Sequence, residues 1–251
     1  MPWSETAPGL SAVALVPGLI LLAYAVLGAP LLGWWLYRWL ERRRESQAGA
    51  LHRFYVITVA IQLLWIVLIA VVVAVSAELG PADLGLRLPH DWLPIAAGVL
   101  GLGAALGAIW LIDQARSRSR RGVPDETVEP GAEVTSALAP RSRAERRIAL
   151  VAGITTSVGE ELLYRAFIVV LLVSLGLAWW AAAVLAVVLF ALAHVYQGWW
   201  GLVGPGLFGA LLMVLYLGTG SLLVPILVHL GVELWNLARA GRGRRHRSRG
   251  R

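Results

Sequence analysis

The chain has 251 residues, of which 58% are hydrophobic and 15% charged, and its formal net charge is +7. Soluble domains carry roughly 25% charged residues, so the composition excludes an ordinary soluble globular protein. The absence of cysteine excludes disulfides, thiol nucleophiles and thiolate metal sites. The excess positive charge alone is compatible with nucleic-acid binding. All 22 basic residues are arginines that lie between long uncharged runs, and this arrangement favours a membrane protein with no nucleic-acid partner.

The uncharged runs are long enough to be membrane-spanning helices, since about 20 helical residues cross the hydrocarbon core. The start, MPWSETAPG, lacks the basic residues of a signal peptide, so the first run is expected to remain as a span. The last three runs are closely spaced between Gly and Pro turns and allow a different count or a re-entrant piece. We therefore expect an all-α, polytopic transmembrane helical bundle of about seven spans, at residues 11–37, 54–77, 92–112, 148–174, 177–196, 201–218 and 221–238.

These runs divide the chain into four regions. Residues 1–112 form an N-terminal three-span membrane region, and 113–147 form a cytoplasmic loop rich in Arg and Pro. We expect residues 148–238 to form a C-terminal four-span core, which the site residues described below mark as the catalytic part, and 239–251 to form a basic cytoplasmic tail. The mixed charges, Pro, Gly and Ser of the loop predict a flexible segment that buries no core.

Arginine placement predicts the orientation, because positively charged segments are retained on the cytoplasmic side. Segment 38–53 holds five arginines, loop 113–147 holds eight and the tail holds seven. An external N-terminus places all three on the cytoplasmic side, with the C-terminus. Most tryptophans lie near predicted span ends, as interfacial anchors do, whereas Trp65 lies in the middle of a span. We expect an integral protein of a bacterial plasma membrane.

Ionisable side chains other than tyrosine are confined to the C-terminal spans. A charge inside the bilayer is costly, so it indicates pairing or function. Glu161 and Arg165 lie four residues apart and are expected to form an ion pair on one helix face. Glu160 points about 100° away, which leaves it free to act as a general base or acid. The alternative is a packing network of all three side chains.

Two later spans carry histidines. His194 follows Phe190 by four residues near the predicted cytoplasmic end of its span, where an interfacial hydrogen bond is the simpler explanation. His229 and Glu233 share a face, with Asn236 about one turn further, and a His–Glu pair that holds two spans together is the simpler explanation there. Taken together, Glu160, His194 and His229 are predicted to line one cavity suited to water activation. The HExxH and GxSxG patterns of other hydrolases are absent.

The ordered motifs EExxxR (Glu160, Glu161, Arg165), FxxxH (Phe190, His194) and a final His with a polar residue four on resemble the type II CAAX prenyl endopeptidase family. This family is also called the CPBP or Abi family of intramembrane proteases. The resemblance covers roughly residues 145–240, and Leu84-Gly-Leu-Arg87 is similar to a weaker feature of bacterial members.

The resemblance implies an all-helical intramembrane peptidase core. In it Glu160 would be the general base, His194 and His229 would assist or bind the oxyanion, and Glu161 and Arg165 would hold the architecture. Glu233 stands where the family has asparagine or aspartate. With His194 and His229 it would complete a zinc ligand set if the chemistry were metal-dependent; otherwise Glu233 would stay protonated and donate a hydrogen bond. We favour the metal-free reaction, with no cofactor.

Three functions remain open at this point. The first is an intramembrane endopeptidase that cleaves a peptide or a membrane-anchored protein, lipidated segments included, near the cytoplasmic half of the bilayer. The second is a non-catalytic membrane scaffold or bacteriocin-immunity-type protein of the same fold. The third is a proton-coupled transporter, since intramembrane Glu, His and Arg also form proton relays. The absence of an inverted repeat counts against the transporter.

Overall fold

A computed structural model of the chain describes residues 9–89 and 132–249, together with scattered positions between 92 and 114. All regular elements in these residues are helices, which confirms the predicted all-α class. The third predicted span, 92–112, lies partly outside the described residues, and the loop residues 115–131 lie wholly outside them. The side chains of the tail beyond Arg239 lie outside them as well.

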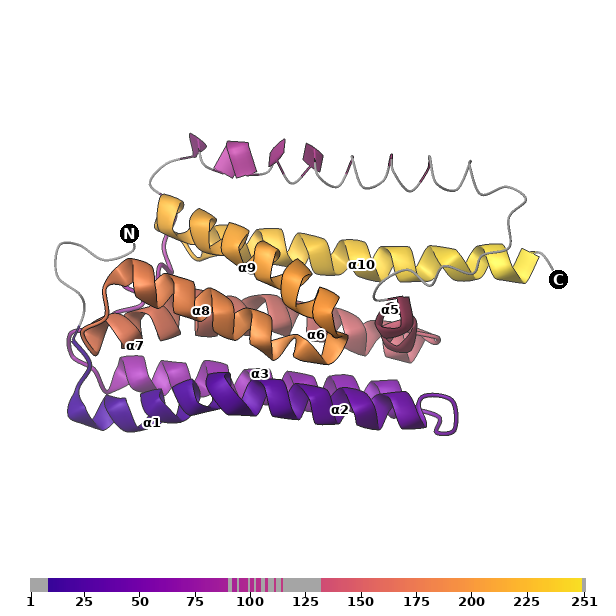
Figure 1. Cartoon of the computed structure of the whole chain (residues 1–251), viewed down its shortest axis with the longest axis horizontal. Coiled ribbons are helices and arrows are strands. Elements are labelled where there is room, and N and C mark those ends of the chain that lie inside the picture. Colours follow the sequence, from indigo (N-terminus) through magenta and orange to yellow (C-terminus); the bar gives the residue numbers. More distant parts are fainter. Residues whose placement is uncertain are drawn as a thin grey trace.

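The N-terminal part is a helical hairpin. Helix α1 (Ala12–Ala23), the π-helical turn η1 (Tyr24–Gly28) and α2 (Ala29–Arg43) follow one another without a break, and α3 (Ala50–Ala74) returns beside them (Figure 1). Ser11 caps α1 by accepting a hydrogen bond from the backbone N–H of Ala14 at 3.2 Å.

The C-terminal part packs against this hairpin as further layers of helices running along the same long axis (Figure 1). Helix α6, the π-helical segment η2 and α7 form one continuous rod, and every residue from 161 to 172 in it is buried. Helix α6 contacts α3 on one side and α10 on the other. The elements in chain order are α6 (Arg143–Glu160), η2 (Glu161–Phe167), α7 (Ile168–Ser174), α8 (Trp179–Ala193), η3 (Val195–Gln197), α9 (Trp199–Thr219) and α10 (Leu223–Arg249).

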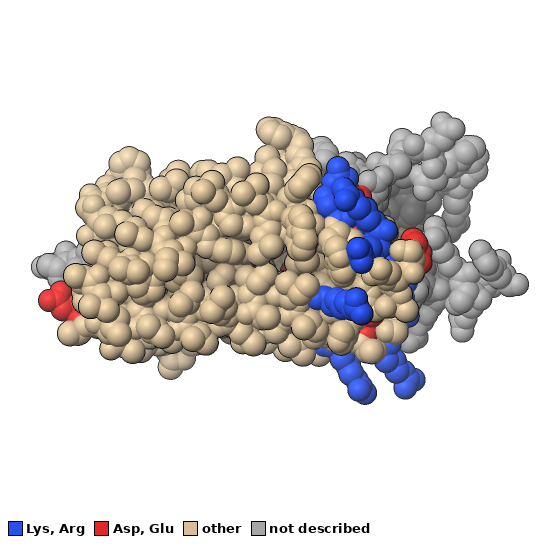
Figure 2. Space-filling model, turned by 90° about the horizontal axis from the view of Figure 1, so that it is seen from below, with Lys and Arg blue, Asp and Glu red and all other residues tan. Residues whose placement is uncertain are grey.

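Three of the described helices are long and apolar enough to cross a membrane, namely Ala12–Arg43, Ala50–Ala74 and Gly201–Thr219, and Trp179–Ala193 is a shorter apolar helix. On the face drawn in Figure 2, the arginines gather at one end of the molecule, beyond a long uncharged surface. This separation of an apolar belt from a basic end is typical of an integral membrane protein. The number of spans, predicted as seven, stays a prediction.

At the end opposite to the α2–α3 turn, the segment Leu84–Arg87 docks on the turn between α9 and α10. The backbone N–H of Leu222 donates to the carbonyl of Gly85 at 2.7 Å, and the Ser221 hydroxyl donates to the carbonyl of Arg87 at 2.6 Å. Gly85 has φ +72°, and a Cβ there would lie 2.7 Å from the ring of Tyr216. Only glycine meets both conditions, and the turn that starts α10 is thereby held in place.

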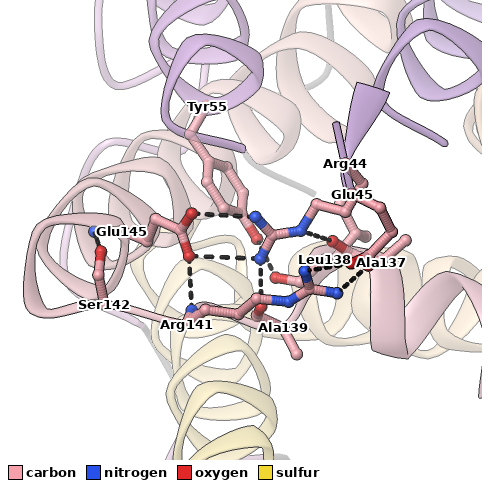
Figure 3. Close-up of polar contacts among 9 residues, drawn as sticks. All are labelled: Arg44, Glu45, Tyr55, Ala137, Leu138, Ala139, Arg141, Ser142 and Glu145. Carbon is pink, nitrogen blue, oxygen red and sulfur yellow. Dashed lines mark hydrogen bonds and ion pairs between the residues drawn. The ribbon is translucent and has the colours of Figure 1, made fainter. Parts of the chain in front are cut away.

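The expectation of an unpacked segment at 113–147 is wrong for residues 132–147. Residues Ala132–Leu138 form the short helix α5, and α6 begins at Arg143. Arg44, at the end of α2, donates to the carbonyls of Ala137 and Ala139 and to both carboxylate oxygens of Glu145 (Figure 3). Composition could not predict this order, because the partner that satisfies these carbonyls lies more than 90 residues away in the chain.

Candidate active site

Glu161 contacts two other buried polar residues, Arg165 and His229. Its side chain is completely buried, and its Oε1 lies 3.1 Å from Arg165 NH1, so the predicted ion pair is present. The same oxygen accepts a hydrogen bond from Nδ1 of His229 at 2.8 Å. One carboxylate therefore ties α10 to the central rod and neutralises the buried guanidinium.

This arrangement corrects the predicted partner of His229. The ring was expected to pair with Glu233 on its own helix, yet its Nε2 lies 4.0 Å from Glu233 Oε1, too far for a hydrogen bond. Because Nδ1 donates to Glu161, the Nε2 of a neutral ring is left as an acceptor. Phe208 packs edge-on against the ring, with centroids 5.4 Å apart.

Glu160 and Glu161 lie on either side of the junction between an α-helix and a π-helical segment. Glu160 ends α6 and Glu161 begins η2. π-Helical turns are uncommon and are frequently found at functional sites. A second one, η1, contains Tyr24, which lies across from this point on the N-terminal rod.

Glu160 lines a cavity of about 120 Å³ between the two halves of the protein. Its Oε2 is buried and makes no hydrogen bond to any described residue. Tyr164, four residues on, lines the same cavity. The remaining lining residues come from the N-terminal hairpin and from the end of α8: Tyr24, Ala29, Leu32, Gly33, Leu36, Phe54, Thr58, Ile61, Gln62, Trp65, Ala193, His194 and Tyr196.

His194 caps the C-terminus of α8 and faces this cavity. Its Nδ1 lies 2.8 Å from the carbonyl oxygen of Phe190, one turn back, so a neutral ring donates from Nδ1 and presents Nε2 as an acceptor. The ring also packs against Phe190, with centroids 4.7 Å apart. Glu160 and His194 thus meet in one cavity as predicted, whereas His229, expected with them, is absent from its lining.

The other two predicted site residues, Glu233 and Asn236, do not line the cavity. The side chain of Glu233 is 37% exposed and packs near Gly153 of α6, and Asn236 is exposed. Within the described part of the chain, no three His, Asp or Glu side chains lie close enough to hold a metal ion. The conditional zinc set of His194, His229 and Glu233 is not assembled, so the residues present do not fit a metal and we derive no step through one.

Sequence reasoning missed the N-terminal wall of the cavity. Trp65 is buried and packs against Tyr24, with centroids 4.9 Å apart. Gln62 is also buried: its Nε2 donates to Thr156 at 2.7 Å, and its Oε1 accepts from Thr155 at 2.8 Å. A mid-span tryptophan and an amide in an apolar run were the available signals, since each is out of place on a lipid-facing surface.

Comparison with known proteins identifies the C-terminal part of the chain. Residues 144–235 match the family model described as Type II CAAX prenyl endopeptidase Rce1-like. This range includes Glu160, Glu161, Arg165, both site histidines and Glu233, and it ends one residue before Asn236. No curated protein and no solved structure matches the chain. The predicted resemblance is confirmed for residues 144–235 of this membrane protein: they match an Rce1-like type II CAAX prenyl endopeptidase domain, and the matched family is a family of peptidases.

Proposed function

We propose that the protein is an intramembrane endopeptidase in which Glu160 activates water for the cleavage of a peptide bond. The observation that carries the proposal is the contrast between two neighbouring carboxylates. The Oε2 atoms of both lack a hydrogen-bond partner among the described residues, but Oε1 of Glu161 contacts Arg165 and His229, and only Glu160 lines the cavity. A base must reach a water molecule, and only Glu160 has space for one.

The reaction follows from these positions. The Glu160 carboxylate takes a proton from water as the water oxygen attacks the carbonyl carbon of the substrate. The carbonyl electron pair moves to oxygen, and the protonated Glu160 then returns the proton to the amide nitrogen as the C–N bond breaks. His194 presents Nε2 as an acceptor that orients the water, while Glu161, Arg165 and His229 hold the rod in place.

The substrate class that we propose is a peptide or a membrane-anchored protein segment, lipidated ones included. The lining residues of the cavity include one acid, one histidine and no arginine, and much of its N-terminal wall is apolar. Such a wall accommodates an uncharged, membrane-embedded segment better than a charged soluble peptide.

The test compares the membrane proteomes of cells that express the wild type and Glu160→Gln, by sequencing new protein termini. We expect one or a few cleavage products that disappear in Glu160→Gln while its folded yield stays normal. Glu41→Gln, in an exposed pair with Arg38, is the matched control and should retain the products. Identical termini in the wild type and Glu160→Gln would support a non-catalytic scaffold instead.

We also propose that the arginine-rich end is cytoplasmic, with the N-terminus outside. Because the chain has no cysteine, single substitutions can be labelled selectively. Ser46→Cys lies in the turn between α2 and α3, and Ala82→Cys lies in the turn at the opposite end; both positions are exposed. A membrane-impermeant maleimide added to intact cells should label Ala82→Cys but not Ser46→Cys. The reverse pattern would overturn the orientation.

A further inference from the structure

Tyr164, which lines the cavity, has a buried hydroxyl without a described partner. Tyr164 is 1% exposed, and its hydroxyl makes no hydrogen bond to any described residue. Leaving a buried hydroxyl unpaired is costly, so such a group calls for an explanation. An apolar phenylalanine would fill the same space without this cost.

The ring of Tyr164 is held in a defined orientation. It packs edge-on against Phe190, with centroids 5.4 Å apart and an interplanar angle of 79°. Phe190 in turn contacts the His194 ring and lies beneath the Arg165 guanidinium at 4.0 Å. The hydroxyl is therefore fixed before any ligand arrives, which is what effective stabilisation of a developing charge requires.

Tyr164 also lies beside the proposed base. It follows Glu160 by four residues and lines the same cavity. A substrate carbonyl that receives a water activated by Glu160 must lie within this cavity, and its oxygen becomes negatively charged as the water attacks. Of the two site histidines, His229 is tied to Glu161, and a neutral His194 uses its N–H on Phe190. Neither neutral ring then has a free N–H for an oxyanion.

We propose that Tyr164 is a further catalytic residue, whose hydroxyl donates a hydrogen bond to the oxyanion of the tetrahedral intermediate. The proposal rests on the proposed peptidase function. As the water oxygen bonds to the carbonyl carbon, the carbonyl electron pair moves onto oxygen and the Tyr164 O–H donates to it without transferring its proton. When the C–N bond breaks, the carbonyl reforms and the hydrogen bond weakens.

The chain supplies a matched control. Tyr216 is also fully buried and its hydroxyl also lacks a described partner, but it packs against Gly85 at the other end and does not line the cavity. Tyr164→Phe and Tyr216→Phe thus remove the same atom from two equally buried positions. Neither substitution removes a described hydrogen bond, so both variants are expected to fold in normal yield.

The substrate probe is the peptide that spans the cleavage site found by comparing the wild type with Glu160→Gln. For Tyr164→Phe we expect kcat to fall about 100-fold with KM nearly unchanged, as for the loss of one oxyanion donor. The pH–rate profile should be lowered at all pH values without a shift of its inflection. Tyr216→Phe should keep the wild-type kcat and KM.

Three results would overturn the proposal. One is an unchanged kcat in Tyr164→Phe, and another is an equal loss in Tyr216→Phe. The third is a shifted inflection of the pH–rate profile, which would mean that Tyr164 acts through Glu160. Products that persist in Glu160→Gln would instead overturn the proposed function itself, so the two failures are distinguishable.

Discussion

Glu160 and Glu161 are chain neighbours with opposite environments. Glu161 is fully buried and holds two partners from different turns and helices, whereas Glu160 faces a cavity. A charge buried with its partner is stable, but the same charge alone is costly. The two positions should therefore respond differently to substitution.

We predict that Arg165→Ala lowers folded yield, while Glu160→Gln does not. The alanine variant leaves Glu161 as a buried charge with only His229 near it, and breaking such a pair costs roughly 3–5 kcal/mol. The amide in Glu160→Gln removes a charge that has no described partner. Size-exclusion chromatography of the detergent-extracted proteins measures both yields. Equal, full yields would contradict this division of roles.

Glu233 stands where the family that the C-terminal part resembles has asparagine or aspartate. Its carboxylate lies 4.0 Å from His229 Nε2 and is partly exposed, so no strong interaction depends on its charge.

We predict that Glu233→Gln retains activity within a few-fold of the wild type, because the amide keeps the size and the polar atoms of the side chain. Product formation and zinc content of the purified protein are the measurements. Loss of activity in Glu233→Gln, together with stoichiometric zinc in the wild type, would show that these residues rearrange around a metal.

At the scale of elements, the site depends on the close approach of α9 to the central rod. A Cβ on Gly209 would lie 2.7 Å from Phe190 Cδ1 and 3.2 Å from Arg165 NH2. Phe190 carries the contacts to both Tyr164 and His194. The absence of a side chain at Gly209 therefore sets the position of several site residues through one aromatic ring.

We predict that Gly209→Ala destabilises the protein by roughly 1–3 kcal/mol, as overpacking of a core does. Gly204→Ala, on the same helix, is the control: a Cβ added there would meet no atom within 4 Å, so the variant should be neutral or slightly stabilising. Thermal unfolding in detergent measures both variants. Equal melting temperatures for Gly209→Ala and the wild type would show that α9 shifts freely.

At the scale of the whole molecule, Arg44 and Glu145 join the N-terminal hairpin to the C-terminal helices (Figure 3). Both side chains are about nine-tenths buried. Burial alone would raise the pKa of the Glu145 carboxyl, but hydrogen bonds from Arg44 and from the Arg141 backbone outweigh it and hold the pKa below its usual value of 4.5. The nearby pair of Arg141 and Glu45 is more exposed.

We predict that Glu145→Gln lowers the stability of the protein by roughly 3 kcal/mol near neutral pH, because it leaves Arg44 buried without its counter-charge. A lowered pKa in the folded state stabilises the protein above the ordinary pKa, and this contribution is lost as the pH falls through the lowered value. Melting temperatures of variant and wild type should therefore converge as the pH falls below the lowered pKa of Glu145.

Glu45→Gln is the matched control for the buried pair of Arg44 and Glu145. It removes a carboxylate from the exposed pair with Arg141, and exposed pairs contribute little to stability. Its melting temperature should equal that of the wild type throughout. A difference between Glu145→Gln and the wild type that persists at low pH would show that the loss is one of packing and not of charge.

The sequence by itself determined the features that depend on local composition. Apolar runs predicted the described helices to within a few residues at most ends, because burial in lipid requires uncharged stretches of defined length. The i, i+4 spacing of Glu161 and Arg165 predicted their ion pair, because a helical turn brings these side chains together. The ordered motifs predicted the family that the match confirms.

Only the tertiary structure decided which residues meet across helices. His229 pairs with Glu161 and not with Glu233, which lies on its own helix. Tyr24, Gln62 and Trp65 line the cavity from the N-terminal hairpin. Arg44 pairs with Glu145, about 100 residues further along the chain. Helical periodicity predicts which face a side chain occupies but not which helix lies against that face. The packing of the helices decides which side chains meet, and the two π-helical segments change the direction in which the following side chains point.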